Sequence, residues 1–254
     1  MRSRGILLVF LAGSTVAACL GTETKHRFYG NAYAQRGEHE KAVREYEAVL
    51  RTNPDDAAAS CLLGHSLFEL DRLDEAERKY RDALRIDRDL GDAHFGLALL
   101  LARRDANEEA ATHFEAVVRQ NPRDLTSLTN LGRLYLAAGK LDLASAKLEQ
   151  ALSIQPDDVA ASFMLGRVQI ERGLHDEARR TFQKLGRLAP NEAYAPYGLA
   201  AIEANRGNRG EAIRHLRLAL EKGIEDAGSI RRDAAFRSLA SDPELEALLS
   251  RHER

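Results

Sequence analysis

The sequence predicts an all-α protein in which six helix-turn-helix repeats stack side by side as a solenoid. Three columns of residues recur every 34 positions along the 254-residue chain, and they carry this prediction. The first column is a small residue, the second is an alanine followed four positions later by a large side chain, and the third is a proline. One such repeat cannot bury its apolar stripe alone, so we expect the repeats to bury it against one another.

The residues before the first repeat have the features of a secretory signal. Arg2 and Arg4 precede the uncharged segment 5–18, which is too short to span a bilayer comfortably. Residues 16–19, Val-Ala-Ala-Cys, end the segment with small side chains and a thiol.

Residues 16–19 resemble the lipobox of bacterial lipoproteins. The resemblance implies that residues 1–18 are removed and that Cys19 becomes the lipidated N-terminus of a short linker, residues 19–22. The resemblance also implies that this residue carries three acyl chains. Because each buried methylene contributes about 0.8 kcal/mol to membrane binding, three chains anchor a protein stably in the membrane. Leu20 and Gly21 lack the aspartate that retains lipoproteins in the inner membrane, which implies the periplasmic face of the outer membrane. The alternative is a plain signal peptide with an incidental cysteine.

The charge balance of the mature chain argues against two classes of partner. Removal of residues 1–18 leaves 35 basic against 39 acidic side chains, a formal net charge of −4. Nucleic acids and anionic membranes both favour a basic surface, so neither is expected to bind. Cys61 is the second cysteine, and no intramolecular disulfide is available once Cys19 carries lipid.

The first helix of each repeat carries a small residue that lets the second helix approach closely. These residues are Gly30, Gly64, Gly132 and Gly166, with Ala98 and Ala200 in the same column. Another column falls at the turn between the two helices, where a left-handed backbone suits glycine. It contains Gly37, Asp71, Asp105, Gly139, Gly173 and Gly207.

The second helix of each repeat carries a buried alanine and a large side chain that we expect to fill the space toward the neighbouring repeat. The alanines are Ala42, Ala76, Ala110, Ala144, Ala178 and Ala212, and the large residues are Tyr46, Tyr80, Phe114, Leu148, Phe182 and Leu216. Prolines then end the second helix. They are Pro54, Pro122, Pro156 and Pro190, with Arg88 in place of the missing member.

These columns resemble those of the tetratricopeptide repeat. The resemblance covers six repeats, at residues 23–56, 57–90, 91–124, 125–158, 159–192 and 193–226. It implies a right-handed superhelix with a concave and a convex face. We expect residues 227–254 to cap the last repeat with two short helices, the first over residues 234–239 and the second starting at Asp242-Pro243.

No motif in the sequence indicates catalysis. The eight histidines make no metal-ligand spacing, and neither a phosphate-binding glycine loop nor a nucleophile elbow is present. The glycines and acidic pairs are explained by the repeat and by helix starts. The sequence therefore predicts a binding protein that is not an enzyme, without metal or cofactor apart from the covalent lipid.

In tetratricopeptide proteins one stripe of each first helix lines the concave groove, and the resemblance implies which residues do so here. They are Arg27, Asn31, Cys61, His65, Phe68, Phe95, Leu99, Thr129, Arg133, Leu136, Phe163, Arg167, Ile170, Tyr194 and Tyr197. Chaperone-binding members of the family hold the terminal carboxylate of a peptide with basic and asparagine residues. Arg27 and Asn31 match this clamp, but His65, Phe95 and Leu99 replace its other residues. An apolar groove with a few arginines suits an amphipathic helix or an extended apolar segment of a partner protein, and the alternative is that these side chains pack against the next first helix.

The combination of a lipobox with six repeats is similar to the pilotins of type IV pilus systems, tetratricopeptide lipoproteins that help a secretin assemble its outer-membrane ring. This resemblance implies a membrane-anchored scaffold or chaperone with a secretin subunit as partner, needed for pilus-dependent motility. Two alternatives remain open, an adaptor that docks cell-wall hydrolases or proteases and a lipoprotein of the tight-adherence pilus apparatus.

We predict that Cys19→Ala releases the protein from the outer membrane, because the acyl chains are attached to this residue. The variant is expected as an uncleaved precursor or as a soluble periplasmic protein when membranes are fractionated and immunoblotted. Unchanged outer-membrane fractionation of the variant would contradict the lipobox interpretation.

Overall fold

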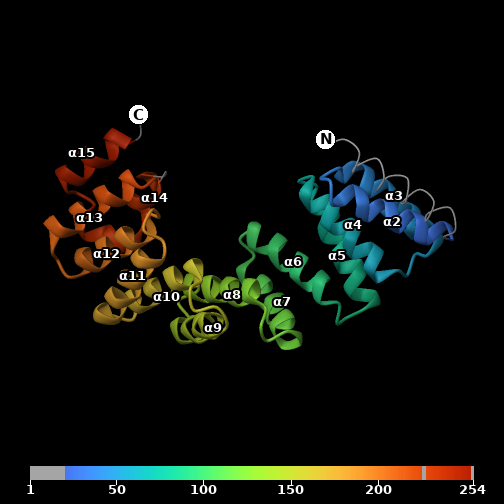
Figure 1. The fold of residues 1–254 in the computed structure, drawn as a ribbon, viewed down its shortest axis with the longest axis horizontal. Helices are drawn as coiled ribbons and strands as arrows, with labels where there is room; N and C mark the ends of the chain where they lie inside the picture. The colour runs from blue at the N-terminus through green and yellow to red at the C-terminus, as the bar shows by residue number, and fades with distance from the viewer. Residues whose placement is uncertain (1–20, 225–226, 253–254) are drawn as a thin grey trace, which may run out of the picture. The chain divides into compact units, whose positions relative to one another are not determined.

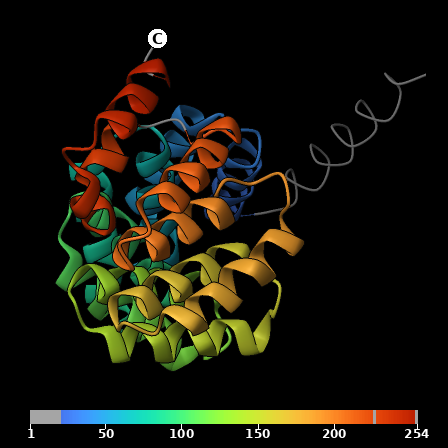
Figure 2. The same cartoon turned by 90° about the vertical axis from the view of Figure 1, so that its left-hand side faces the viewer.

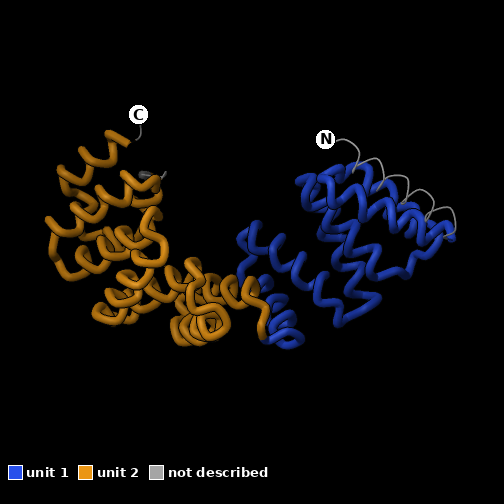
Figure 3. The backbone as a smooth tube through the Cα atoms, in the orientation of Figure 1, with its two compact units in different colours: residues 1–122 blue, residues 123–254 orange. Residues whose placement is uncertain are grey.

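The computed structural model describes residues 21–224 and 227–252, and every regular element in these residues is a helix, which confirms the predicted all-α class. The lipobox and Cys19 lie outside the described residues. The chain divides into two compact units, an N-terminal unit of residues 1–122 and a C-terminal unit of residues 123–254 (Figure 3).

The N-terminal unit contains three helical hairpins. They are α2 (Thr22–Ala34) with α3 (His39–Thr52), α4 (Ala57–Glu69) with α5 (Leu73–Ile86), and α6 (Gly91–Arg103) with α7 (Asn107–Gln120). The two helices of each hairpin pack together, and α3 packs on α4 as α5 does on α6 (Figure 1). The hairpins therefore form a continuous stack within this unit.

The C-terminal unit contains three more hairpins and a C-terminal segment. The hairpins are α8 (Leu125–Ala137) with α9 (Leu141–Ile154), α10 (Val159–Glu171) with α11 (His175–Leu188), and α12 (Tyr194–Asn205) with α13 (Arg209–Glu221). The segment comprises α14 (Ala227–Arg232), the 3-10 helix η1 (Ala234–Leu239) and α15 (Pro243–His252). Figure 2 shows the helices of this unit lying in successive layers, with η1 packed on α12 and α15 on α13.

The turns inside the hairpins confirm the predicted left-handed column. Gly37, Gly139, Gly173 and Gly207 have φ angles of 73°, 68°, 74° and 77°. The two aspartates of the column, Asp71 and Asp105, adopt the same region at 60° and 58°. A non-glycine residue is strained there, and aspartate tolerates it better than most because its short side chain can hydrogen-bond locally. All six hairpins consequently use one turn conformation.

Three of the six first helices begin with the same side-chain cap, and α2, α6 and α12 have none. The carboxylates of Asp56, Asp124 and Asp158 accept a hydrogen bond from the backbone N–H three residues later, at 2.9, 2.8 and 2.7 Å, and so cap α4, α8 and α10. Leu90 occupies this column before α6 and offers no side-chain cap. The same junction also lacks the proline, since Arg88 stands in its place.

In four of the six hairpins the two helices meet where a glycine of the first faces a large side chain of the second. A Cβ atom added to Gly30 would lie 2.6 Å from the Tyr46 ring, and one added to Gly166 would lie 2.4 Å from the Phe182 ring. The predicted close approach is thus confirmed. The large residue fills the contact within its own repeat, whereas the sequence indicated only the space toward the next one.

Two of these rings also contact a glycine of the following repeat, which confirms the prediction that they fill the space toward the neighbouring repeat. Tyr80 lies against both Gly64 and Gly96, with added Cβ atoms 3.0 and 2.5 Å from the ring. Phe182 contacts Gly198 in the same way, at 2.2 Å. Each ring is therefore held between two backbones and is completely buried.

The C-terminal segment keeps the register of the repeats. The second helices begin at residues 39, 73, 107, 141, 175 and 209, and α15 begins another 34 residues on, at Pro243. The two predicted capping helices are present, at residues 234–239 as η1 and from Pro243 as α15, and α14 precedes them. Asp233 stands in a column that holds leucine in most repeats, and its carboxylate accepts a hydrogen bond from Ala235 N at 2.9 Å. That hydrogen bond ends α14 and starts η1. The segment therefore resembles a seventh repeat with a broken first helix.

We predict that Gly198→Ala destabilises the C-terminal unit, because the new methyl group would overlap the fully buried Phe182 ring. The expected loss is about 1–3 kcal/mol, measured as a lower thermal unfolding midpoint. Gly210→Ala is the matched control, since nothing lies within 4 Å of its added Cβ in α13. The control is expected to gain up to about 1 kcal/mol from helix propensity. Equal midpoints for the two variants would contradict the ring contact.

Candidate functional site

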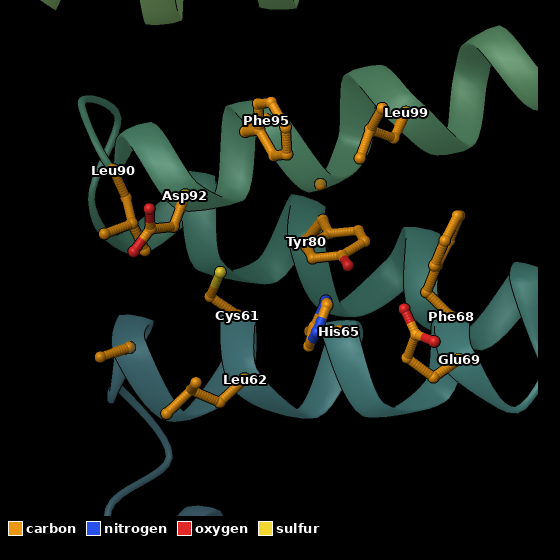
Figure 4. Close-up of a pocket in the computed structure, with 12 residues that line it drawn as sticks. Cys61, Leu62, His65, Phe68, Glu69, Tyr80, Leu90, Asp92, Phe95 and Leu99 are labelled. Carbon is orange, nitrogen blue, oxygen red and sulfur yellow. The ribbon is translucent and has the colours of Figure 1, made fainter. Parts of the chain in front are cut away.

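A cavity of about 400 Å³ lies between α4 and α6 in the N-terminal unit (Figure 4). It is called the α4–α6 cavity below. Five of the residues that the resemblance assigned to the groove line it: Cys61, His65 and Phe68 from α4, and Phe95 and Leu99 from α6. The structure thus brings side chains of two successive first helices together around one opening.

The floor of the cavity is formed by aromatic rings. Phe95 is half-buried and packs edge-on against Phe114, with ring centroids 5.9 Å apart. The Tyr80 ring of α5 lies at the edge of the cavity, buried behind the backbone of Gly96. Burial raises the pKa of Tyr80, so its phenol stays neutral. The floor is accordingly apolar.

Two carboxylates stand at the ends of this floor. Asp92 lies in the first turn of α6, next to Leu90, and Glu69 ends α4 beside Phe68 (Figure 4). Both side chains are exposed, and within residues 21–224 and 227–252 neither forms an ion pair. Their charge is therefore available to a bound molecule.

Cys61 is a buried thiol of low reactivity. Burial, with the negative charge of Asp92 as the smaller cause, raises the pKa of Cys61 to about 12. The thiolate is the nucleophilic form of cysteine, and at neutral pH almost none of it is present. Cys61 therefore contributes a small apolar surface to the cavity.

A second cavity, of about 740 Å³, lies in the C-terminal unit among α10, α12 and the C-terminal segment. Three of the predicted groove residues line it, Arg167, Ile170 and Tyr197. The Tyr197 hydroxyl donates to the Asp233 carboxylate at 2.6 Å, and Arg167 lies 3.7 Å from the same carboxylate. Burial and this hydrogen bond raise the pKa of Tyr197. The chain's own C-terminal segment thus already engages Tyr197 and Arg167 of this cavity.

The first two predicted groove residues are also engaged within the chain. Arg27 forms ion pairs with Asp56 and, at 3.2 Å, with Glu23. Asn31 accepts a hydrogen bond from the Tyr46 hydroxyl at 2.8 Å. These contacts connect the first helix to its neighbours.

The remaining predicted groove residues lie in the C-terminal unit. Leu136 is buried in the core, with an exposed fraction of 7%. Arg133 donates to Asn130 at 3.5 Å, over three positions of α8. In the next hairpin, the Phe163 ring packs on the first helix that follows.

Phe163 lies 4.9 Å from Tyr194 and 6.3 Å from Tyr197, measured between ring centroids. This packing against α12 corresponds to the alternative that the sequence analysis left open. Tyr194 itself remains exposed at 41%.

The described residues hold no group of three or more His, Cys, Asp or Glu side chains placed to bind a metal ion. His94 and His113 approach each other, with their Nδ1 atoms 2.8 Å apart, and His94 Nε2 lies 3.0 Å from the carbonyl oxygen of Arg88. None of the helices in the described part of the chain is both long and apolar enough to cross a membrane.

Comparison with known families identifies the repeat. Models described as tetratricopeptide repeat match residues 61–124 and 135–202, and a model described as TPR repeat matches residues 30–71. The chain belongs to the tetratricopeptide repeat family. Proteins of this family bind protein partners, and the fold is typically a non-catalytic scaffold.

Two curated proteins match about half of the chain. The cell division cycle protein 27 homolog of Caenorhabditis elegans is 29% identical over 123 residues, 46% of this chain and 16% of the relative. Anaphase-promoting complex subunit 3 of Schizosaccharomyces pombe is 22% identical over 132 residues, 52% of this chain and 20% of the relative. The chain thus matches a fifth or less of the length of these relatives.

Solved structures show the same fold at low sequence identity. A tetratricopeptide repeat protein from Parabacteroides merdae has a TM-score of 0.71 at 18% identity, covering 92% of this chain and 99% of its own. YrrB, described as a TPR protein with an unusual peptide-binding site, has a TM-score of 0.62 at 24% identity, covering 70% and 91%. MamA from Desulfovibrio magneticus RS-1 has a TM-score of 0.63 at 20% identity, covering 67% and 97%.

The sequence analysis missed several residues of the α4–α6 cavity. Tyr80 was assigned to packing alone, and Asp92, Glu69 and Leu90 were not singled out, although all four line the cavity. A signal was present in the sequence, because Gly96 stands in a column that holds larger side chains in four of the six repeats.

We predict that Cys61 is alkylated by iodoacetamide at least about 100-fold more slowly in the native protein than after unfolding, since burial and the raised pKa both suppress the thiolate. The measurement uses the Cys19→Ala variant, in which Cys61 is the remaining thiol, with the same protein in urea as the control. Similar rates in the two states would show that the thiol is not buried.

Proposed function

We propose that this protein is a non-catalytic scaffold that holds a segment of a partner protein in the α4–α6 cavity. The observation that carries the proposal is an open apolar floor between two first helices with an uncompensated carboxylate at each end. In the cavity of the C-terminal unit, Tyr197 and Arg167 already contact Asp233 of the same chain. Partner binding is therefore assigned to the N-terminal unit.

The chemistry of the cavity suits capture of apolar side chains. Full burial of one leucine or phenylalanine side chain contributes about 1.5–3 kcal/mol. Phe68, Phe95 and Leu99 are half-buried in the free protein, so a partner can still cover them. Cys61 stays neutral and adds no reactive group. Together these properties favour reversible binding over chemical conversion.

The comparisons agree with a binding role without identifying the partner. YrrB is described as having a peptide-binding site, and the Schizosaccharomyces pombe relative is named as a subunit of a multiprotein complex. Both descriptions concern other proteins, and the low identity extends only the fold to this chain. For this protein they support the proposal that the repeats contact polypeptide.

We further propose that the scaffold is anchored by lipid on Cys19 to the periplasmic face of the outer membrane, where it acts like a pilotin on a secretin subunit. The lipobox register of residues 16–19 and the similarity to tetratricopeptide pilotins support this role. A membrane anchor confines the scaffold and a membrane-inserting client to one surface, which raises their effective concentration. The adaptor and tight-adherence roles are the outcomes to expect if secretin assembly does not depend on the protein.

We predict that replacing both Phe95 and Leu99 by alanine leaves secretin subunits as monomers, because aromatic anchors commonly contribute about 2 kcal/mol or more to an interface. The measurement is an immunoblot for heat-resistant secretin multimers, with pilus-dependent movement as a second readout. The control replaces Leu143 and Leu218, two exposed leucines that lie outside the cavity.

Thermal unfolding of both double variants separates loss of binding from loss of folding, since Phe95 also packs on Phe114. Normal multimers with a stably folded Phe95 and Leu99 variant would remove the cavity from the mechanism. Normal multimers in a complete deletion strain would remove the pilotin role and favour the adaptor.

A further inference from the structure

The charges around the α4–α6 cavity indicate which kind of segment it binds. We propose that the partner presents an extended segment whose apolar side chains enter the cavity and which carries a lysine or arginine on each side of them. This inference rests on the proposed function, because it specifies the occupant of the same site.

The two carboxylates lie at opposite ends of the apolar floor. Asp92 is the second residue of α6, and Glu69 is the thirteenth and last residue of α4. The two helices run in the same direction, so the two residues differ by eleven helical positions along the groove (Figure 4). A helix rises 1.5 Å per residue, so the two carboxylates stand about 16 Å apart along the groove. An extended chain rises about 3.3 Å per residue and spans this distance in about five residues.

The fields of both carboxylates reach the floor. Burial is the main reason that the pKa values of Cys61 and Tyr80 are raised, and Asp92 adds to the shift of Cys61 as Glu69 adds to that of Tyr80. A cation of a bound segment would lie in the same fields. Rim pairs of this kind select the sign of the partner's charge and accelerate its approach.

The positive groups near the cavity do not cancel the two acids. Arg103 lies 5.8 Å from the centre of the Phe68 ring, and its guanidinium pairs with Asp71 at 2.7 Å. The turn before α6, residues 87–89, contains two aspartates and one arginine. His65 is exposed on the opposite wall, on α4. The opening therefore favours positive charge.

The spacing of the cavity wall matches an extended segment. In an extended segment every second side chain points to the same face, with a spacing of about 6.6 Å. Phe95 and Leu99 are four helical positions apart, which corresponds to about 6 Å along the floor. Alternate side chains of an extended segment therefore match successive residues of the cavity wall.

The test is binding of fluorescein-labelled six-residue peptides to the purified full-length protein, followed by fluorescence anisotropy. The first peptide has leucine at its third and fifth positions, lysine at both ends and serine elsewhere. The second has glutamate at both ends, and the third keeps the lysines but replaces the leucines by serine. We expect the lysine-leucine peptide to bind at least about tenfold more tightly than either of the others.

The protein variant for the same assay is Asp92→Asn with Glu69→Gln. We expect it to bind the lysine-leucine peptide about three- to tenfold more weakly and with a smaller dependence on salt. The matched control is Glu47→Gln with Glu108→Gln, which makes the same change in net charge at exposed positions of α3 and α7. The control is expected to bind as the unmodified protein does.

The outcomes separate this inference from the proposed function. Equal affinity for the lysine-ended and glutamate-ended peptides, or no effect of the Asp92 and Glu69 changes, would overturn the charge preference while leaving an apolar peptide site. Equal weakness of the leucine and serine peptides would overturn the cavity as a peptide site altogether. Tighter binding by a helical peptide of the same composition would overturn the extended conformation.

Discussion

The contact between a small residue of the first helix, glycine in four hairpins and alanine in two, and a large side chain of the second helix determines how each hairpin is built. At Gly30, Gly132 and Gly166 an added Cβ would lie within 2.4–2.6 Å of the opposing side chain, so no larger residue fits without movement. The large residue is completely buried in the resulting contact. Because the hairpin turns share one left-handed conformation, this contact recurs at the same position along the helices of each hairpin. Each hairpin therefore presents an equivalent surface to the next one. The stacking within each unit depends on this repeated fit.

The two cavities arise where a second glycine extends that contact. Gly96 faces the ring of Tyr80 and lines the α4–α6 cavity, and Gly198 faces the ring of Phe182 and lines the cavity of the C-terminal unit. Four of the six repeats carry a larger residue in this column, whose side chain takes up space that the glycines leave open. A glycine in this column thus leaves a concave surface. The two cavities differ in occupancy, since Asp233 enters only the second.

Much of the fold could be predicted because it repeats. The turn glycines, including the substitution by Asp71, and the fully buried alanine column represented by Ala144 were predicted, since six copies separate a packing requirement from chance. The candidate site was predicted only in part, because it depends on departures from the repeat that occur once or twice. Leu90 and Gly96 each look like tolerated variation in a single sequence. The role of Asp233 depends on tertiary contact with Tyr197, which no column of the repeat contains.

The internal contact of Asp233 also indicates how charge could distinguish the two units. In the C-terminal unit the Tyr197 hydroxyl and the Arg167 guanidinium contact a carboxylate, and the chain itself supplies that carboxylate from Asp233. In the N-terminal unit the apolar floor lies between carboxylates, so the complementary group is a cation that must come from outside. The second cavity is lined by acidic as well as basic side chains, Glu171 and Asp233 with Arg167 and Arg232. The chain itself thus supplies the carboxylate that Tyr197 and Arg167 contact, whereas the carboxylates at the ends of the first cavity pair with no group of the described residues.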